Sequence, residues 1–320
     1  ADRRRGPGMT SAPLGGRNPR GGSIYDLGYR GYEGPRLGRR AAVMALLIHT
    51  LRTAYGLGRN TRSKVMPVGL VVLAVLPSLL AIGVLVLFAQ FAPALEASEA
   101  LEALQPITYA TMFPFTATLV FLFSAAQAPE LFGRDQLAGT LPLYFSRAIS
   151  RSDYALARML GLFLALLVLV LAPQTILFVG RVLVAGDLGS GVGEELANVP
   201  VALIVALIIA GVVGTLSAAI AALTPRRSYA TVAIVAVFLI PNVFAALLVV
   251  LETGLLGQLS VLFSPADVLD GVNAFFFDSR PDNDTVLEAG LDYWVYVVGA
   301  AAWIIGSLAV LLLRYRRLAL

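Results

Sequence analysis

Side chains that could do chemistry are sparse in this 320-residue chain, and the most informative group of them lies between Glu130 and Arg158. In this segment Arg, Asp and Glu residues are interspersed with Leu, Phe and Tyr. A disordered linker would lack that apolar content, so the segment predicts a short amphipathic helix that presents one face to a partner. We expect Pro142 to end that helix, and Ser150 or Ser152 to cap the next one. An interfacial loop that binds only lipid headgroups is the alternative.

Groups for catalysis or metal binding are few. The chain has no Cys and a single His, His49, so thiolate nucleophiles, Cys-held clusters and His-rich metal centres are not expected. The only Lys, Lys64, lacks the preceding Gly and the following Ser or Thr of a phosphate-binding loop. Asp282 and Asp284 lack the 12-residue pattern of a calcium loop. We expect no enzyme activity and no cofactor in this chain.

Six windows without Asp, Glu, Lys or Arg identify the elements that must position the polar segment. Each holds at least 21 residues, enough for an α-helix to cross a hydrocarbon core of roughly 30 Å. The windows are residues 65–95, 103–129, 159–180, 196–225, 228–251 and 293–313. The sequence therefore predicts an all-α polytopic membrane protein with six transmembrane helices. Because the windows contain no ionisable side chain, a proton relay or an ion-coupled carrier is not expected.

The charge between the windows alternates in sign. Of the 24 basic residues, 22 fall on the side shared by both termini, and the positive-inside rule makes that side cytoplasmic. This topology accounts for the pI of about 9.5, so we expect no nucleic-acid partner.

Two regions precede the six-span domain, which we place at residues 65–320. Residues 1–36 are rich in Arg, Gly and Pro and predict a disordered basic cytoplasmic arm. Residues 37–64 predict an interfacial amphipathic helix and a linker, with a soluble partner for the helix as the alternative. The predicted apolar face consists of Met44, Leu47, Ile48, Leu51 and Tyr55. The opposite, polar face is expected to contain His49, Thr50, Arg52 and Thr53.

Two further patterns concern packing. Residues 253–266 are free of charge but number only 14, too few to cross a membrane. With residues 266–278 they predict short helices that form a reentrant segment before the last span. In the fourth window, small residues recur at spacings of three and four, which favours close helix contact in lipid. They are Gly211, Thr215, Ala218 and Ala222.

The 130–158 segment resembles the corresponding loop in permease subunits of type 2 (ABC-2) ABC exporters, actinobacterial members in particular. The similarity consists of a Glu-containing end of the second span, a Gly-Thr-Leu run and a Ser-Arg-x-x-Ser-Arg stretch. Here these residues are Glu130, Arg134, Gly139, Thr140, Leu141, Ser146, Arg147, Ser150 and Arg151. The stretches YDLGYRGYEGPRLGRR and GLGRNTRSK are also similar, and the resemblance covers about residues 30–320.

This resemblance implies a permease subunit of an ATP-driven exporter in a bacterial cell membrane, with both termini cytoplasmic. The chain would pair with a second permease copy or paralogue and with two separate ATPase subunits, which hold the ATP and Mg. Within the 130–158 segment, the family pattern places an ATPase-coupling helix. Its contact residues would be Glu130, Arg134, Asp135, Gln136, Gly139, Thr140, Leu141, Arg147 and Arg151. Leu131, Leu137 and Leu141 would supply buried area, with Arg134 and Asp135 fixing the orientation.

The turn that contains Arg226 and Arg227 would make a second cytoplasmic contact. An apolar path between paired permeases would suit amphipathic, lipid-like or drug-like cargo. Candidate path residues, each of which could instead serve helix packing, are Thr116, Thr118, Gln174, Thr175, Thr215, Ser217 and Asn242. The alternative function is a non-transporting membrane scaffold or sensor that recruits a cytoplasmic partner. A lipid-processing membrane enzyme is disfavoured because no catalytic group is identifiable.

Overall fold

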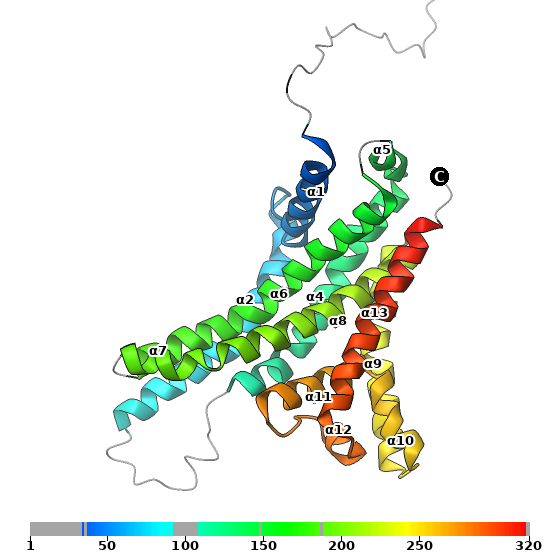
Figure 1. The fold of residues 1–320 in the computed structure, drawn as a ribbon. Helices are drawn as coiled ribbons and strands as arrows, with labels where there is room; N and C mark the ends of the chain where they lie inside the picture. The colour runs from blue at the N-terminus through cyan, green and yellow to red at the C-terminus, as the bar shows by residue number, and fades with distance from the viewer. Residues whose placement is uncertain (1–33, 35–36, 92–107, 147–148, 186–187, 318–320) are drawn as a thin grey trace, which may run out of the picture. The chain divides into compact units, whose positions relative to one another are not determined.

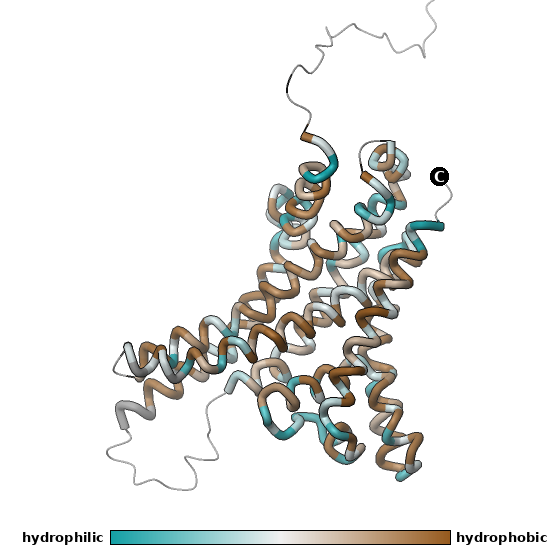
Figure 2. Tube along the Cα trace, viewed as in Figure 1, coloured by the Kyte–Doolittle hydropathy of each residue, from teal (hydrophilic) through white to brown (hydrophobic). Residues whose placement is uncertain are grey.

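The computed structural model describes residues 34, 37–91, 108–146, 149–185 and 188–317, and every regular element within them is a helix (Figure 1). Six helices are long and apolar enough to cross a membrane. They are α2 (Arg62–Phe91), α4 (Tyr109–Leu137), α6 (Arg151–Val184), α8 (Val199–Leu223), α9 (Arg227–Val250) and α13 (Tyr293–Arg316). The chain is an all-α polytopic membrane protein, and each predicted window lies mainly within one of these helices. Figure 2 shows the apolar lengths of these helices as brown stretches.

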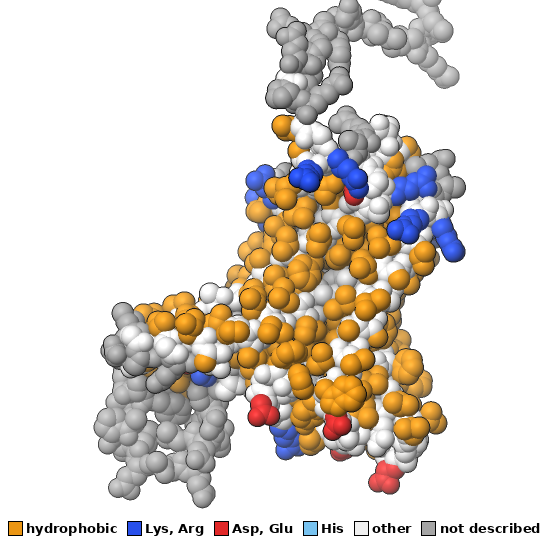
Figure 3. All heavy atoms as spheres, viewed as in Figure 1, with side chains coloured by type: hydrophobic (Ala, Val, Ile, Leu, Met, Phe, Trp, Pro, Cys, Tyr) orange, Lys and Arg blue, Asp and Glu red, His pale blue; other side chains and the backbone are white. Residues whose placement is uncertain are grey.

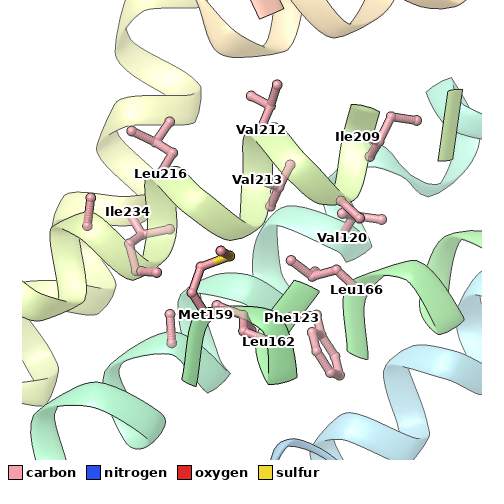
Figure 4. Close-up of a cluster of buried hydrophobic side chains, with 14 of the residues drawn as sticks. Val120, Phe123, Met159, Leu162, Leu166, Ile209, Val212, Val213, Leu216 and Ile234 are labelled. Atoms are coloured by element: carbon pink, nitrogen blue, oxygen red, sulfur yellow. The ribbon is translucent and has the colours of Figure 1, made fainter. Parts of the chain in front are cut away.

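Helix α8 lies at the centre of the bundle, where it contacts α4, α6, α9 and α13. Its predicted row of small residues, Gly211, Thr215, Ala218 and Ala222, is buried. The neighbouring Gly214 allows close approach, because a Cβ there would lie 3.6 Å from the backbone of Phe163 in α6. Buried side chains from α4, α6, α8 and α9 fill the space between these helices (Figure 4). Small residues thus let the helices of the core approach closely, and larger apolar side chains supply most of the buried surface between them.

Charged side chains distinguish two ends of the bundle, with blue Lys and Arg at the top of Figure 3 and most of the red acids at the bottom. We call the first the basic end: it holds the C-termini of α4 and α13 and the N-termini of α6 and α9. The acidic end holds three short helices, α10 (Leu255–Ser260), α11 (Pro265–Phe277) and α12 (Asp284–Ala289). This separation follows the alternation of charge along the sequence.

Short helices were predicted before the last span, and the structure confirms them. Helix α10 and the 3-10 turn Val261–Phe263 meet α11 at an angle of 93°. Ser264 lies at the bend, where its hydroxyl accepts a hydrogen bond from the backbone N–H of Asp267 at 3.3 Å. This hydroxyl caps α11 and ends the preceding helical direction. A further short helix, α7 (Leu188–Leu196), connects α6 to α8.

The first helix, α1 (Gly38–Ala54), packs against α6. Its buried residues are Leu46, Thr50 and Ala54, whereas Met44 and Ile48 are exposed. The prediction that Thr50 lies on a polar face is wrong. Its hydroxyl donates to the carbonyl of Leu46 at 2.7 Å, and its methyl group faces Gly161 of α6. Satisfying the hydroxyl within its own helix lets the rest of the Thr side chain pack as an apolar group.

Residues 37–320 form one compact unit, so α1 is part of the same unit as the spans, and α2 begins at Arg62 rather than at residue 65. The predicted arm, residues 1–36, lies outside the described residues except for Gly34.

Replacement of Gly161 by Leu should separate α1 from α6. A Cβ at Gly161 would lie 2.6 Å from the Thr50 Cβ, and overpacking of this kind typically costs about 1–3 kcal/mol. We expect a lower unfolding temperature in detergent and increased maleimide labelling of a Cys placed at Leu46. The matched control is Gly306→Leu, because Gly306 has no neighbouring atom within 4 Å of its Cβ position. Equal effects of both substitutions would contradict the proposed contact.

Candidate functional site at the basic end

Helix α4 runs without a break from its apolar part into the charged segment and ends at Leu137. The chain then turns at Gly139, which has a φ of +63°, a value that favours glycine. The next helix, α5, is only five residues long (Leu141–Phe145). Pro142 lies in the first turn of α5, so the prediction that Pro142 ends a helix is wrong; a residue without an N–H fits the start of a helix.

Ser150 caps α6, as predicted. Its hydroxyl accepts from the backbone N–H of Asp153 at 3.2 Å, and the Asp153 carboxylate accepts from the Ser150 N–H at 3.0 Å. Asp153 also forms two hydrogen bonds of 2.7 Å with the Arg39 guanidinium. This partner raises the pKa of Arg39 above its ordinary value. The capping box therefore also connects α6 to the first turn of α1.

Asp135, near the end of α4, is part of a largely buried network with α6. It forms an ion pair with Arg158 and accepts a hydrogen bond of 2.6 Å from the hydroxyl of Tyr154. The Arg158 side chain is 5% exposed and the Asp135 side chain 16%. Arg158 also reaches the hydroxyl of Thr50 in α1, at 3.5 Å. One carboxylate thus links three helices.

An aromatic cluster extends this network to α5 and α13. The Tyr154 ring lies between 5.3 and 5.9 Å from the rings of Tyr144, Phe145 and Tyr315. Gln136 of α4 donates to the Tyr315 hydroxyl at 3.4 Å. The short helix α5 is therefore seated on side chains from α6 and is held in a defined position relative to α4 and α13.

Glu130 of α4 joins two further segments at the same end, the turn after α1 and the start of α9. Its carboxylate lies 2.8 Å from Arg59, 3.3 Å from Arg227 and 3.7 Å from Arg134. The turn between α8 and α9 lies against α4, because a Cβ on Gly133 would be 3.0 Å from the Pro225 carbonyl. The structure thus places the two predicted cytoplasmic contacts, the 130–158 segment and the Arg226–Arg227 turn, side by side.

The last turns of α4 separate two clefts. The larger one, of about 950 Å³, is bordered by α1, the turn after it, α4 and α5. Its polar lining consists of His49, Arg52, Thr53, Arg59, Glu130, Arg134, Asp135, Thr140, Tyr144, Ser146 and Arg158. The smaller cleft, of about 380 Å³, lies on the other side and includes Gly133, Leu137, Pro225 and Arg227. We call the last turn of α4 and the following helix α5, with the exposed Leu137 and Leu143, the ridge. An exposed ridge beside clefts is a geometry suited to docking of a partner protein.

The predicted coupling residues divide into internal and exposed groups. Leu131 and Leu141 are 1% and 6% exposed and belong to the core, so the prediction that they supply contact area for a partner is wrong. Leu137 and Leu143 are 64% and 67% exposed instead. Sequence reasoning missed Leu143, because a five-residue helix provides too little periodicity to identify its outer face.

The remaining predicted residues at this end lie as follows. The Thr140 hydroxyl donates to the Asp135 carbonyl at 3.2 Å. Arg151 donates to the carbonyl of Arg316 at 3.1 Å, and the Arg226 guanidinium lies 5.5 Å from the centre of the Tyr229 ring. Arg147 is outside the described residues.

The predicted path residues are spread over α4, α6, α8 and α9. Thr116 and Thr215 are buried and donate to carbonyls of their own helices at 2.8 and 2.7 Å. Ser217 of α8 donates to Ser124 of α4 at 3.1 Å. Three more residues differ in exposure: Thr118 and Thr175 are exposed, and Gln174 is buried. The Thr175 hydroxyl donates to the carbonyl of Leu171 at 2.8 Å. Five of the seven, counting Asn242 below, therefore bond to other groups of this chain.

A buried polar cluster at the acidic end was not predicted. Asp267 of α11 is fully buried, and its Oδ1 accepts from the side-chain amides of Asn242 in α9 and Asn283, at 2.6 and 2.7 Å. Asp270 accepts from the backbone N–H groups of Asp282 and Asn283, at 3.3 and 3.0 Å. The spacing of the two Asp residues, one turn apart between apolar neighbours, was the available signal. The cluster holds the bent helix pair against α9.

Within the described residues, no group of three or more His, Cys, Asp or Glu side chains could hold a metal ion. Comparisons with protein-family models and with curated proteins found no match to this chain. The function is therefore inferred from the residues and their geometry.

Removing one partner of the Asp135–Arg158 pair should be costly, at about 3–5 kcal/mol, because the other charge is left buried and unpaired. We expect Asp135→Asn and Arg158→Met to lower stability in detergent markedly, and the double variant to lose less than the sum of the two. Urea or SDS unfolding of the four proteins gives the coupling energy. The control is the exposed Arg280–Asp284 pair, at 70% and 80% exposure, whose removal should cost no more than about 1 kcal/mol. Strict additivity at Asp135 and Arg158 would contradict the network.

Proposed function

We propose that this chain is a transmembrane permease subunit of an ATP-driven exporter of the ABC-2 type. In this proposal it pairs with a second permease and with two separate ATPase subunits, which bind ATP and Mg. The observation that carries the proposal is the ridge at the basic end. There α4 and α5 present exposed apolar residues, and ion pairs, hydrogen bonds and aromatic contacts hold these helices to the spans.

A coupling element must bind a partner and must also transmit its movement. Leu137 and Leu143 provide exposed apolar contacts next to the charged Arg134, which suits a protein interface with an apolar centre and a polar rim. The Asp135, Tyr154 and Arg158 network fixes the same ridge to α6 and α13. A displacement of α5 would therefore move several spans together rather than bend a loop.

The charge distribution supports a cytoplasmic position for this ridge. The basic end contains the arginines of α1, α4, α9 and α13, and the positive-inside rule assigns such an end to the cytoplasm. An ATPase partner in a bacterial cytoplasm would then meet the ridge and the adjacent Arg226–Arg227 turn together.

The cargo is proposed to be amphipathic, lipid-like or drug-like. The midsections of the spans carry hydroxyl and amide groups but no Asp, Glu, Lys, Arg or His. Such surfaces favour apolar cargo over ions or sugars. Thr118 and Thr175 are exposed on the outside of the single chain, so they would be available at an interface with a second permease.

The decisive experiment is co-purification of the full chain with candidate ATPase subunits, followed by native mass measurement and an ATPase assay in lipid. We expect a complex of two permeases and two ATPases whose ATP hydrolysis is stimulated by cargo. A chain that inserts normally but captures no ATPase would favour the scaffold or sensor function instead.

The exposed ridge leucines should determine ATPase capture. We expect the double substitution Leu137→Asp and Leu143→Asp to reduce the amount of co-purified ATPase at least tenfold, since about 1.4 kcal/mol of lost contact energy is sufficient for that change. The unfolding temperature should stay unchanged, because both side chains are outside the core. Leu37→Asp is the control, because Leu37 is 77% exposed and lines neither cleft. Undiminished capture by the double variant would contradict the ridge as the docking element.

A further inference from the structure

The larger cleft at the basic end has an excess of positive charge. Two carboxylates line it, those of Glu130 and Asp135. Four arginines line it as well: Arg52, Arg59, Arg134 and Arg158. The difference is two positive charges, with His49 not counted. Both carboxylates already form the ion pairs described above. The cleft lining therefore has fewer negatively charged acceptors than guanidinium donors.

Two arginines of the lining have guanidinium N–H groups for which the described residues supply no carboxylate or hydrogen-bond acceptor. Among the described residues, no carboxylate pairs with Arg52, which is exposed on α1. The Nε of Arg158 has no hydrogen-bond partner and is buried, as is the residue, which is 4% exposed. The exposed Arg52 guanidinium, in the same cleft lining as Arg134, matches an anion with several acceptor oxygens, as a phosphate has.

The border of the cleft is apolar. Leu57 and Leu143 line it and are 51% and 67% exposed. Met44 and Ile48 precede Arg52 by two turns and one turn on the same side of α1, and both are exposed. A small soluble anion gains nothing from these side chains. An amphipathic anion can place its charged group among the arginines and its chains along α1.

We propose that this cleft binds the phosphate-containing headgroup of an anionic phospholipid from the leaflet at the basic end. Arg52 and Arg134 contact the phosphate, and the acyl chains follow the exposed apolar stripe of α1. The bound lipid would connect α1 to the ridge formed by α4 and α5. This site requires only that the chain lies in a membrane, so it does not depend on the exporter assignment.

The test is a lipid titration of the purified full chain in detergent, followed by native mass spectrometry. Palmitoyl-oleoyl phosphatidylglycerol is the anionic probe, and the zwitterionic phosphatidylcholine with the same chains is the reference. We expect preferential retention of the anionic lipid. The double substitution Arg52→Gln and Arg134→Gln should weaken its binding about tenfold or more, in line with the contribution of two bases near anionic lipid.

The control removes the same charge at the same end but outside the cleft, by Arg316→Gln and Arg317→Gln. Both side chains are exposed and neither lines the cleft, so anionic-lipid affinity should change less than about twofold, as for a solvated base. If the cleft variant is unstable, Arg52→Gln alone replaces it, since Arg52 has no ion pair among the described residues to lose.

Three results would overturn the proposal. Equal losses in the two double variants would show general attraction to a basic surface rather than a site. Equal retention of the two lipids would exclude headgroup recognition. Saturable binding of inorganic phosphate, with no preference for the anionic lipid, would identify the ligand as a soluble anion.

Discussion

The ion pair between Asp135 and Arg158 is the interaction on which the basic end depends. Taking two charges out of water costs several kcal/mol per ion, and the cost is recovered only when each remaining polar group finds a partner. Asp135 finds Tyr154 and Arg158, while Arg158 also reaches Thr50. Those partners come from different helices, so the positions of α1, α4 and α6 follow from the same requirement. The aromatic cluster around Tyr154 then adds α5 and α13.

The middle of the bundle is held by a different kind of contact. Helices in lipid gain little from apolar burial alone, so close packing at small residues supplies much of the attraction between them. The Gly and Ala residues of α8 and Gly161 of α6 provide that proximity. Hydroxyl groups in these regions mostly bond to carbonyls of their own helices, as Thr50, Thr116 and Thr215 do. These hydroxyl groups therefore need no charged partner, and the charges are concentrated at the two ends (Figure 3).

Together these contacts hold the end of α4 and α5 against the spans and leave them as an exposed ridge. Ionic and aromatic contacts fix α5 relative to the spans, and Leu137 and Leu143 remain free to meet a partner. The cleft beside the ridge has arginines inside and apolar residues at its border. A protein partner on the ridge and a lipid in the cleft would therefore act on the same helices, which links the proposed transport function to the composition of the surrounding membrane.

The wrong predictions for the charged segment and for Thr50 have different physical reasons. The apolar pattern of the 130–158 segment was read as one helix with one outer face, but α4 continues straight into it and a separate helix follows. Leu131 and Leu141 consequently face the core, and Leu143 faces outward. Thr50 was assigned to a polar face by residue type, although its hydroxyl is satisfied locally. The polar cluster around Asp267 depends on Asn242 and Asn283, which are distant in sequence, so the local spacing of Asp267 and Asp270 does not identify their partners.

By itself the sequence determined the six spans, the separation of charge between the two ends and the short helices before the last span. These features are local: they follow from hydrocarbon thickness, the cost of burying charge and the rules of helix capping. Only the tertiary structure decided which side chains of the charged segment are internal and which are exposed. That distinction depends on contacts between residues such as Asp135, Arg158 and Tyr315, whose neighbours are set by the packing of helices far apart in the chain.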